Sequence, residues 1–278
     1  MAIKAIALDI DGTLTNDEKV ITPRTREALL AAQRAGITVI LASGRPVQGL
    51  RSLGADLDLE HHHGLLVACN GGRVVDAETN ELLYAEPMSV EHLQAVVRHM
   101  RNFDVIPWIV DGDQLYIQQG ISHIIYHKGK PVDIVEYERK HCDLTLTEVP
   151  DLLDVCTKPQ DKVLVAGTDT YLAEHWRAMR EPFAETLNCM FTADFYYEYV
   201  EPTVDKGNAL QFALPKLGIA REELVAFGDG QNDVGMLTFA GVGVAMGNAI
   251  EETKRAADMV CGTNNEDGIA DALEQLLG

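Results

Sequence analysis

Short apolar runs alternate with helix-like segments at both ends of this chain, and this alternation constrains the fold more than any other feature. Near the start, the apolar runs are Ala5–Leu8, Ile37–Ala42 and Leu65–Cys69. Continuous apolar runs of this length are typical of strands buried on both faces of a parallel sheet. Between the first two runs, Thr22 suits a helix N-cap and Pro23 suits the first helical position. The first forty residues therefore predict a β-α-β unit.

The end of the chain returns to the same pattern. The apolar runs there are Leu224–Phe227, Val242–Ala245 and Ala257–Val260, and the predicted helices are Lys206–Leu217 and Asp267–Leu277. Strands that alternate with helices indicate a parallel sheet with helices on both faces. The predicted class is therefore α/β, with a Rossmann-like parallel sheet as the core.

The middle of the chain has a different pattern. It combines a helical stretch, Val90–Arg101, with alternating strands such as Gln114–Ile117, and it holds most of the aromatic residues. Alternation with a period of two is typical of half-buried strands. We expect a separate α+β domain at 86–195, inserted into a core domain formed by 1–85 and 196–278.

Two carboxylates follow the first apolar run directly. Asp9 and Asp11 would share one face if both extended the strand, and Gly12 allows the chain to turn away afterwards. Paired carboxylates repel each other unless a cation lies between them or one is protonated. The alternative is a structural turn, because Asp-Gly is a common turn pair.

A second acidic segment follows the strand that ends at Phe227. Asp229 and Asp233 lie there with two glycines and Asn232. Oxygen ligands of this kind suit Mg²⁺, although a simple turn remains an alternative. Because ligands bind beyond the carboxyl ends of parallel strands, we expect both acidic segments at one edge of the sheet.

Two further segments suit an anion. Ser43 and Gly44 follow a predicted strand and precede a predicted helix start, where the first N–H groups favour negative charge. Lys206 begins a helix, where its charge opposes the helix dipole unless a negative group lies nearby. Taken singly, each has an ordinary alternative: an N-cap for Ser43 and a solvated side chain for Lys206.

Together these segments resemble the four motifs of the haloacid dehalogenase superfamily: Asp9-Ile10-Asp11-Gly12-Thr13, Ser43, Lys206 and Gly228–Asp233. The phrases Ser43–Pro46, Cys69–Gly71, Ala245–Ala249 and Asn265–Gly268 are similar to the Cof-type sugar phosphatase branch. The resemblance covers nearly the whole chain and is weakest in the middle.

The resemblance implies a phosphatase that acts through an aspartyl-phosphate at Asp9, with Asp11 as general acid and base. It implies Mg²⁺ held by Asp9, the backbone carbonyl of Asp11, Asp229 and Asp233. It also implies that Ser43, Gly44, Lys206 and Asn232 bind the phosphoryl group; Arg45 is either a phosphate contact or a structural residue. Asp11 argues against carbon–halogen cleavage, which needs no acid at that position.

The position of the inserted domain narrows the substrate. Only residues 12–42 separate Asp11 from Ser43, whereas residues 44–205 separate Ser43 from Lys206, so the insertion lies in the second gap. In the Cof branch this domain is a cap that closes over the site, excludes water and selects the substrate. We expect a small phosphate ester, such as a sugar phosphate. A phosphomutase or phosphotransferase, and a phosphate-binding regulatory module, remain alternatives.

Charge and composition exclude other partners. The formal net charge of −20 should repel nucleic acids and anionic membranes. No apolar stretch approaches the roughly 20 residues of a membrane helix, and the first residues do not resemble a signal peptide. We expect a cytoplasmic protein with reduced cysteines, either a monomer or a homodimer.

Overall fold

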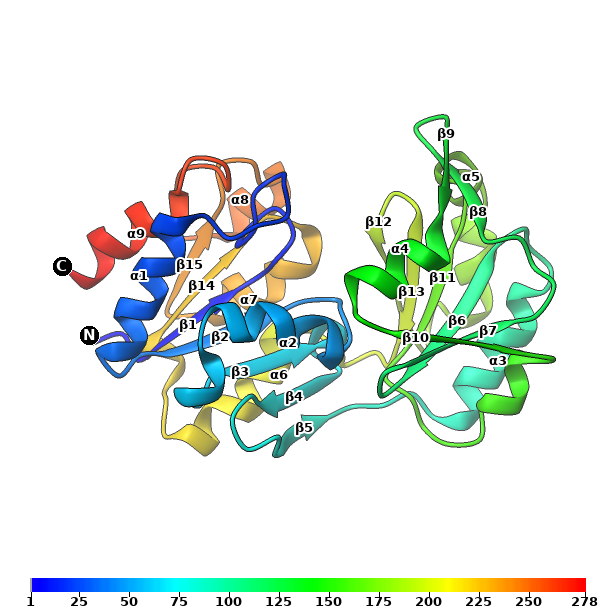
Figure 1. Ribbon diagram of the computed structural model, residues 1–278, viewed down its shortest axis with the longest axis horizontal. Coiled ribbons are helices and arrows are strands. Elements are labelled where there is room, and N and C mark those ends of the chain that lie inside the picture. Colours follow the sequence, from blue (N-terminus) through cyan, green and yellow to red (C-terminus); the bar gives the residue numbers. More distant parts are fainter. Residues whose placement is uncertain (1) are drawn as a thin grey trace. The chain divides into compact units, whose positions relative to one another are not determined.

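The computed structural model describes residues 2–278, which form two compact units (Figure 1). Among the described residues, the core unit comprises 2–85 and 205–278, and the inserted unit comprises Glu86–Val204. The sequence places the second boundary at 195/196, which is too early. Tyr196–Val200 forms strand β13, and this strand pairs with β11 (Val163–Ala166) and β12 (Asn188–Ala193) inside the inserted unit.

The core unit is built on an eight-stranded sheet with the order β16-β15-β14-β1-β2-β3-β4-β5. The strands from β16 to β3 run parallel, as the sequence predicts, and β4 and β5 add an antiparallel hairpin at one edge. The strands are β1 Ala5–Leu8, β2 Thr38–Ala42, β3 Leu65–Ala68, β4 Arg73–Asp76, β5 Leu82–Ala85, β14 Leu224–Gly228, β15 Val242–Ala245 and β16 Met259–Val260.

Helices cover both faces of this sheet because neighbouring side chains of a strand point to opposite sides. In β1, Ile6 and Leu8 pack in one apolar cluster with residues of α1, α2 and α9, and Ala5 and Ala7 pack in another with residues of α6 and α7. The helices are α1 Pro23–Arg34, α2 Val47–Asp56, α6 Lys206–Ala213, α7 Val234–Phe239, α8 Glu251–Ala256 and α9 Gly268–Leu277. The predicted N-cap is confirmed, since the side chain of Thr22 accepts from the N–H of Thr25.

The inserted unit contains a six-stranded mixed sheet in the order β10-β7-β6-β11-β13-β12 and a separate hairpin of β8 and β9. Residues of α3 and α5 pack against one face of the large sheet, and residues of α4 pack against the other. This confirms the expected α+β architecture. The remaining elements are α3 Val90–Met100, β6 Ile106–Asp111, β7 Gln114–Gln118, β8 Ile124–His127, β9 Lys130–Asp133, α4 Ile134–His141, β10 Thr145–Val149 and α5 Asp169–Arg180.

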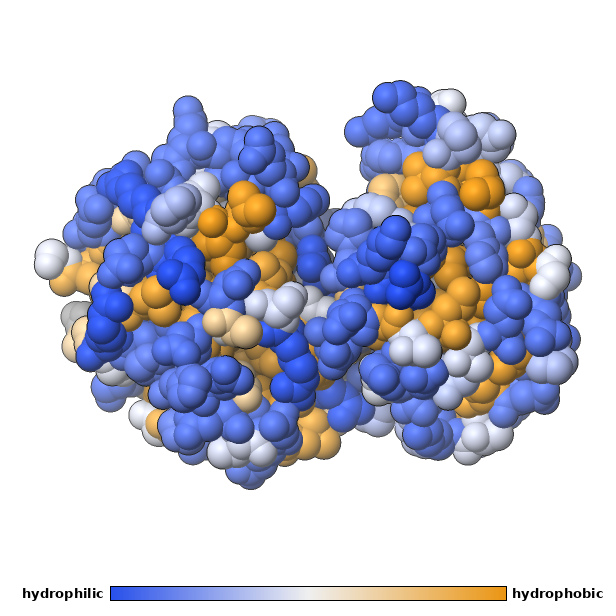
Figure 2. Space-filling model, in the orientation of Figure 1, coloured by the Kyte–Doolittle hydropathy of each residue, from blue (hydrophilic) through white to orange (hydrophobic). Residues whose placement is uncertain are grey.

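Hydrophilic residues cover much of each unit on the face drawn in Figure 2, with smaller apolar patches between them. Exposed large apolar side chains include Leu82 and Phe212 in the core unit and Tyr126 in the inserted unit. Within residues 2–278, no helix has both the length and the apolar character needed to cross a membrane.

Candidate active site

Asp9 and Lys206 meet in the interior of the core unit. Asp9 follows the last residue of β1, and its N–H donates to the carbonyl of Phe227 in β14 over 3.0 Å. Lys206 is the first residue of α6, and its side chain is completely buried. Its Nζ donates to Oδ1 of Asp9 and to Oδ1 of Asp233, each over 2.6 Å. The lysine is therefore a buried cation shared by two carboxylates.

Burial raises the pKa of Asp9 well above its ordinary value; Asp233 adds to this effect and Lys206 opposes it. Burial alone would lower the pKa of Lys206, but Asp233 and Asp9 outweigh it and hold that pKa above its ordinary value. The ammonium of Lys206 is thus held in its charged form. Its single positive charge does not balance the negative charge of the carboxylates around it.

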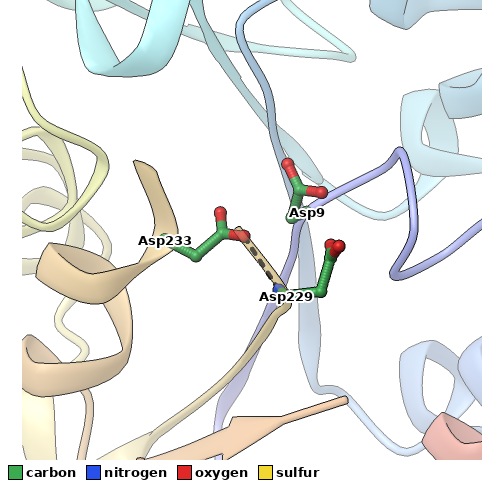
Figure 3. Close-up of side chains that lie close together, drawn as sticks. All are labelled: Asp9, Asp229 and Asp233. Carbon is green, nitrogen blue, oxygen red and sulfur yellow. Dashed lines mark hydrogen bonds between the residues drawn. The ribbon is translucent and has the colours of Figure 1, made fainter. Parts of the chain in front are cut away.

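Asp9, Asp229 and Asp233 form a cluster of acidic side chains at the carboxyl ends of β1 and β14 (Figure 3). Each residue contributes one carboxylate oxygen, and these oxygens all lie within 4.8 Å of one another. Three ionised carboxylates exceed the single charge of Lys206, and their donors are all oxygen. This donor set fits a hard divalent cation such as Mg²⁺.

The two acids of the second segment differ in what their oxygens already accept. Oδ2 of Asp233 accepts from the N–H groups of Asp229 and Gly230, each over 2.9 Å, while its Oδ1 accepts from Lys206. Asp229 accepts one bond at Oδ1, from the hydroxyl of Thr13 over 2.8 Å. Asp233 therefore holds the loop and Lys206 through both of its oxygens. The carboxylate of Asp229 accepts fewer of these hydrogen bonds and so has more lone pairs left to bind a cation.

The environment of Asp229 indicates missing positive charge. Burial raises the pKa of Asp229 to about 6; the hydroxyl of Thr13 opposes this shift and the nearby Asp233 adds to it.

Gly12 allows the close approach of Asp229 to the turn after β1. It has a φ of +88°, and a Cβ at Gly12 would lie 2.5 Å from Oδ2 of Asp229.

Asp11 does not share a face with Asp9. The strand ends at Leu8, and the chain then turns, with the N–H of Leu14 donating to the carbonyl of Asp9. Asp11 is 43% exposed at its side chain and lies outside the acidic cluster formed by the described residues. Because β1 ends before both acids, the condition under which they would share one face is not met.

Asp11 instead pairs with two cations. Nη2 of Arg45 lies 3.0 and 2.9 Å from its Oδ1 and Oδ2, and Nζ of Lys19 lies 2.8 Å from Oδ1. Burial alone would raise the pKa of Asp11, but Arg45 and Lys19 outweigh it and lower that pKa below its ordinary value. The two cations therefore determine the direction of this pKa shift. The role left open for Arg45 is, in this arrangement, that of a partner to Asp11.

Ser43, Gly44 and Asn232 are brought together through Asn70. Ser43 is buried at the end of β2, and its carbonyl accepts from the N–H of Asn70 over 2.9 Å. Nδ2 of Asn232 donates to Oδ1 of Asn70 over 3.0 Å. A Cβ at Gly44 would lie 3.1 Å from Nδ2 of Asn70. The loops after β2, β3 and β14 are therefore in direct contact.

Sequence reasoning missed three residues at this site: Thr13, Lys19 and Asn70. Thr13 lies inside the first motif, and its acidic neighbours could have identified it as a site residue. Lys19 has no signal, because its contact with Asp11 depends on a turn in which Lys19 itself has a φ of +61°. Asn70 lies in a phrase noted only for its resemblance. Lys162, in the inserted unit, is buried and pairs with Glu198 over 2.5 Å.

A sequence model of the haloacid dehalogenase-like hydrolases matches residues 6–273. The pyridoxal phosphate phosphatase YbhA of Escherichia coli strain K12 is 28% identical over 272 residues, which cover 97% of each chain.

Two solved structures share the whole architecture. The chain resembles a haloacid dehalogenase-like hydrolase from Bacteroides thetaiotaomicron with a TM-score of 0.87 and 33% identity, over 99% of both chains. It resembles the HAD subclass IIB sugar phosphatase BT4131 with a TM-score of 0.82 and 26% identity, over 98% of both chains.

Proposed function

The chain belongs to the haloacid dehalogenase-like hydrolases, in their Cof-type branch, and is a phosphoric monoester hydrolase; from this premise we propose that it is a Mg²⁺-dependent phosphatase acting through Asp9. The observation that carries the proposal is the buried group of Asp9, Lys206 and Asp233 beside Asp229. A carboxylate held by a buried cation at the end of a parallel strand is well placed to act as a nucleophile.

We assign the nucleophilic attack to Oδ2 of Asp9, because Lys206 already donates to Oδ1. A bond forms between Oδ2 and phosphorus, and the bond between phosphorus and the ester oxygen breaks. The leaving oxygen takes a proton from Asp11. Water then gives a proton to Asp11 and attacks the phosphorus of the aspartyl-phosphate. The bond to Asp9 breaks, and inorganic phosphate leaves.

This assignment requires Asp11 to change partners. Both of its oxygens accept from Arg45, and one also accepts from Lys19. A carboxylate held by two cations is a poor proton donor, because each cation stabilises the ionised form. Asp11 must therefore separate from at least one of them, and take up a proton, before it can protonate the leaving group.

Asp9, Asp229 and the carbonyl of Asp11 would hold Mg²⁺ directly, and Asp233 would support the site by holding Lys206 and the loop. When bound, the cation supplies positive charge that offsets the charge of the phosphoryl group. Ser43, Gly44, Lys206 and Asn232 would bind the phosphoryl oxygens, which stabilises the charge of the transition state.

The proposed substrate is a small phosphate monoester, such as a sugar phosphate or a similar organic phosphate. The printed names of a sugar phosphatase and a pyridoxal phosphate phosphatase among the similar proteins support this class. An acceptor hydroxyl in place of water would make the protein a phosphotransferase. Both reactions use the same intermediate, so the products must distinguish them.

The test is phosphate release from a panel of small phosphate esters, with Mg²⁺ and with EDTA. We expect release with Mg²⁺, loss of release with EDTA, and loss in the Asp9→Asn variant. Asp58→Asn, which changes a half-buried aspartate paired with His61, is the matched control. Activity of Asp9→Asn equal to that of the control would contradict the mechanism. Phosphorylated acceptor without free phosphate would favour the phosphotransferase.

A further inference from the structure

Three successive residues after β3 have a left-handed backbone. The φ angles are +52° at Cys69, +55° at Asn70 and +99° at Gly71, and all three residues are buried. Two non-glycine residues in this region are unfavourable for L-amino acids and persist only where the surroundings hold them. We call Cys69–Gly71 the left-handed turn, and its contacts explain what holds it.

The backbone of the left-handed turn is bonded to the loop after β2. The N–H of Cys69 donates to the carbonyl of Arg45, and the N–H of Asn70 donates to the carbonyl of Ser43, each over 2.9 Å. These bonds fix the backbone on both sides of Gly44. The orientation of the Ser43 loop is therefore tied to the conformation of the turn.

The turn also contacts the start of α6. A Cβ at Gly71 would lie 2.3 Å from the carbonyl oxygen of Asp205 and 3.0 Å from the nitrogen of Lys206. Such distances leave room for a hydrogen atom alone, so the backbone of Gly71 lies directly against the residue that carries the buried ammonium. The third contact is the bond from Nδ2 of Asn232 to Oδ1 of Asn70, over 3.0 Å.

We propose that the left-handed turn positions the phosphate-binding groups, and that the side chain of Asn70 does so by orienting Asn232. The inference rests on the proposed function, in which Ser43, Lys206 and Asn232 bind the phosphoryl group. Asn70 is a positioning residue, because it acts through Asn232 and the Ser43 loop. The left-handed conformation supplies the geometry that lets one short segment reach three loops.

Asn70→Gly separates the side chain from the backbone. Glycine adopts a φ of +55° without strain, so the variant retains the turn and loses the acceptor for Asn232. The matched control is Asn80→Gly. Asn80 also has a left-handed φ, of +60°, but it is exposed between β4 and β5 and accepts from Arg51. The control thus removes an equivalent side chain from an equivalent backbone at another place in the core unit.

Binding of inorganic phosphate in the presence of Mg²⁺, measured by calorimetry, does not require turnover. Loss of one oriented hydrogen bond should weaken this binding about tenfold in Asn70→Gly. Asn80→Gly should bind as the wild type does. Equal affinity in both variants would overturn the inference while leaving the proposed function intact. A wild type that neither binds phosphate nor releases it from p-nitrophenyl phosphate would overturn both.

A second experiment distinguishes positioning from general structural damage. In the Asn232→Ala background, Asn70→Gly should lower kcat/KM for p-nitrophenyl phosphate by less than about threefold, because the partner is already gone. A loss of kcat/KM in the double variant equal to the product of the two single-variant losses would contradict the inference. If Asn70→Gly does not fold, Asn70→Ser provides the test, because its shorter side chain does not replace the amide oxygen that accepts from Nδ2 of Asn232. Phosphate binding should then weaken about tenfold, and wild-type affinity in Asn70→Ser would count against the proposal.

Discussion

Nζ of Lys206 lies 2.6 Å from Oδ1 of Asp9, and the two side chains are 0% and 9% exposed. The same ammonium lies 2.6 Å from Oδ1 of Asp233. The lysine joins the first helix after the insertion to the first strand of the chain. It is therefore part of the interior of the core unit as well as of the candidate active site.

Lys206→Met should destabilise the protein strongly. The change leaves buried carboxylates without their cation, and removal of one partner from a buried pair costs about 3–5 kcal/mol of the free energy of unfolding. Urea denaturation near neutral pH in EDTA should show the loss. Lys254→Met, at a weak surface pair, is the control. An unchanged unfolding midpoint in Lys206→Met would contradict this account.

Asp9→Asn should have the opposite effect on stability. The pKa of Asp9 is raised in the folded protein, so its stabilising contribution is present at low pH, where it is protonated, and is lost as the pH rises through the folded value. Near neutral pH without metal, the neutral amide removes the repulsion by Asp233 and can still accept from Lys206. We expect a melting temperature equal to or above that of the wild type, together with loss of phosphate release. A large fall in melting temperature in EDTA would contradict the raised pKa.

The parallel sheet and the acidic cluster were predictable from the sequence for the same reason. Apolar runs identify buried parallel strands, and the residues that end such strands must meet at one edge. Asp9, which follows β1, and Asp229 and Asp233, which follow β14, are neighbours because these two strands pair directly. The sequence also indicated that Lys206 needs a negative neighbour, although it suggested a ligand where the structure has carboxylates.

Contacts that depend on turns were not predictable. Asp11 does not extend the strand beside Asp9 because β1 ends at Leu8, before either acid, and its partner Lys19 has a left-handed backbone that no residue pattern identifies. The boundary predicted at 195/196 placed Glu198 and its neighbours in the core domain. Their membership in the inserted unit follows from pairing with β11, which is distant in sequence.

Binding of Mg²⁺ should weaken as the pH falls through about 6, the value to which burial and Asp233 raise the pKa of Asp229. Below that pH the protonated acid is a poor ligand. Without metal, the protonated form of Asp229 stabilises the fold, and this contribution is lost as the pH rises through the same value. The rise in melting temperature caused by Mg²⁺ should therefore be larger at about pH 8 than at about pH 5. Asp229→Asn should remove most of the rise at both pH values, and equal rises in the wild type at both would contradict the prediction.

Arg45→Gln should raise the pKa of Asp11, because the guanidinium is the main group that lowers it. If Asp11 donates a proton to the leaving group, a higher pKa keeps it protonated over a wider range. The alkaline limb of the pH profile of kcat/KM should then move to higher pH. Lys19→Gln removes the second cation and should shift the limb in the same direction. A profile that keeps its alkaline limb in both variants would exclude Asp11 as the group that titrates there.

The buried pair of Lys162 and Glu198 offers a test of stability in the inserted unit, which does not contain the residues of the acidic cluster. Their side chains are 7% and 2% exposed, and Nζ lies 2.5 Å from Oε1. Glu198→Ala leaves a buried ammonium, so the free energy of unfolding should fall by about 3 kcal/mol or more. Lys162→Met combined with Glu198→Leu removes both charges while keeping similar volume, and this double variant should lose less stability than Glu198→Ala alone. Urea denaturation of the single and double variants measures the difference. A double variant that is less stable than Glu198→Ala would contradict this prediction. It would show that the ion pair adds net stability, instead of only neutralising two buried charges.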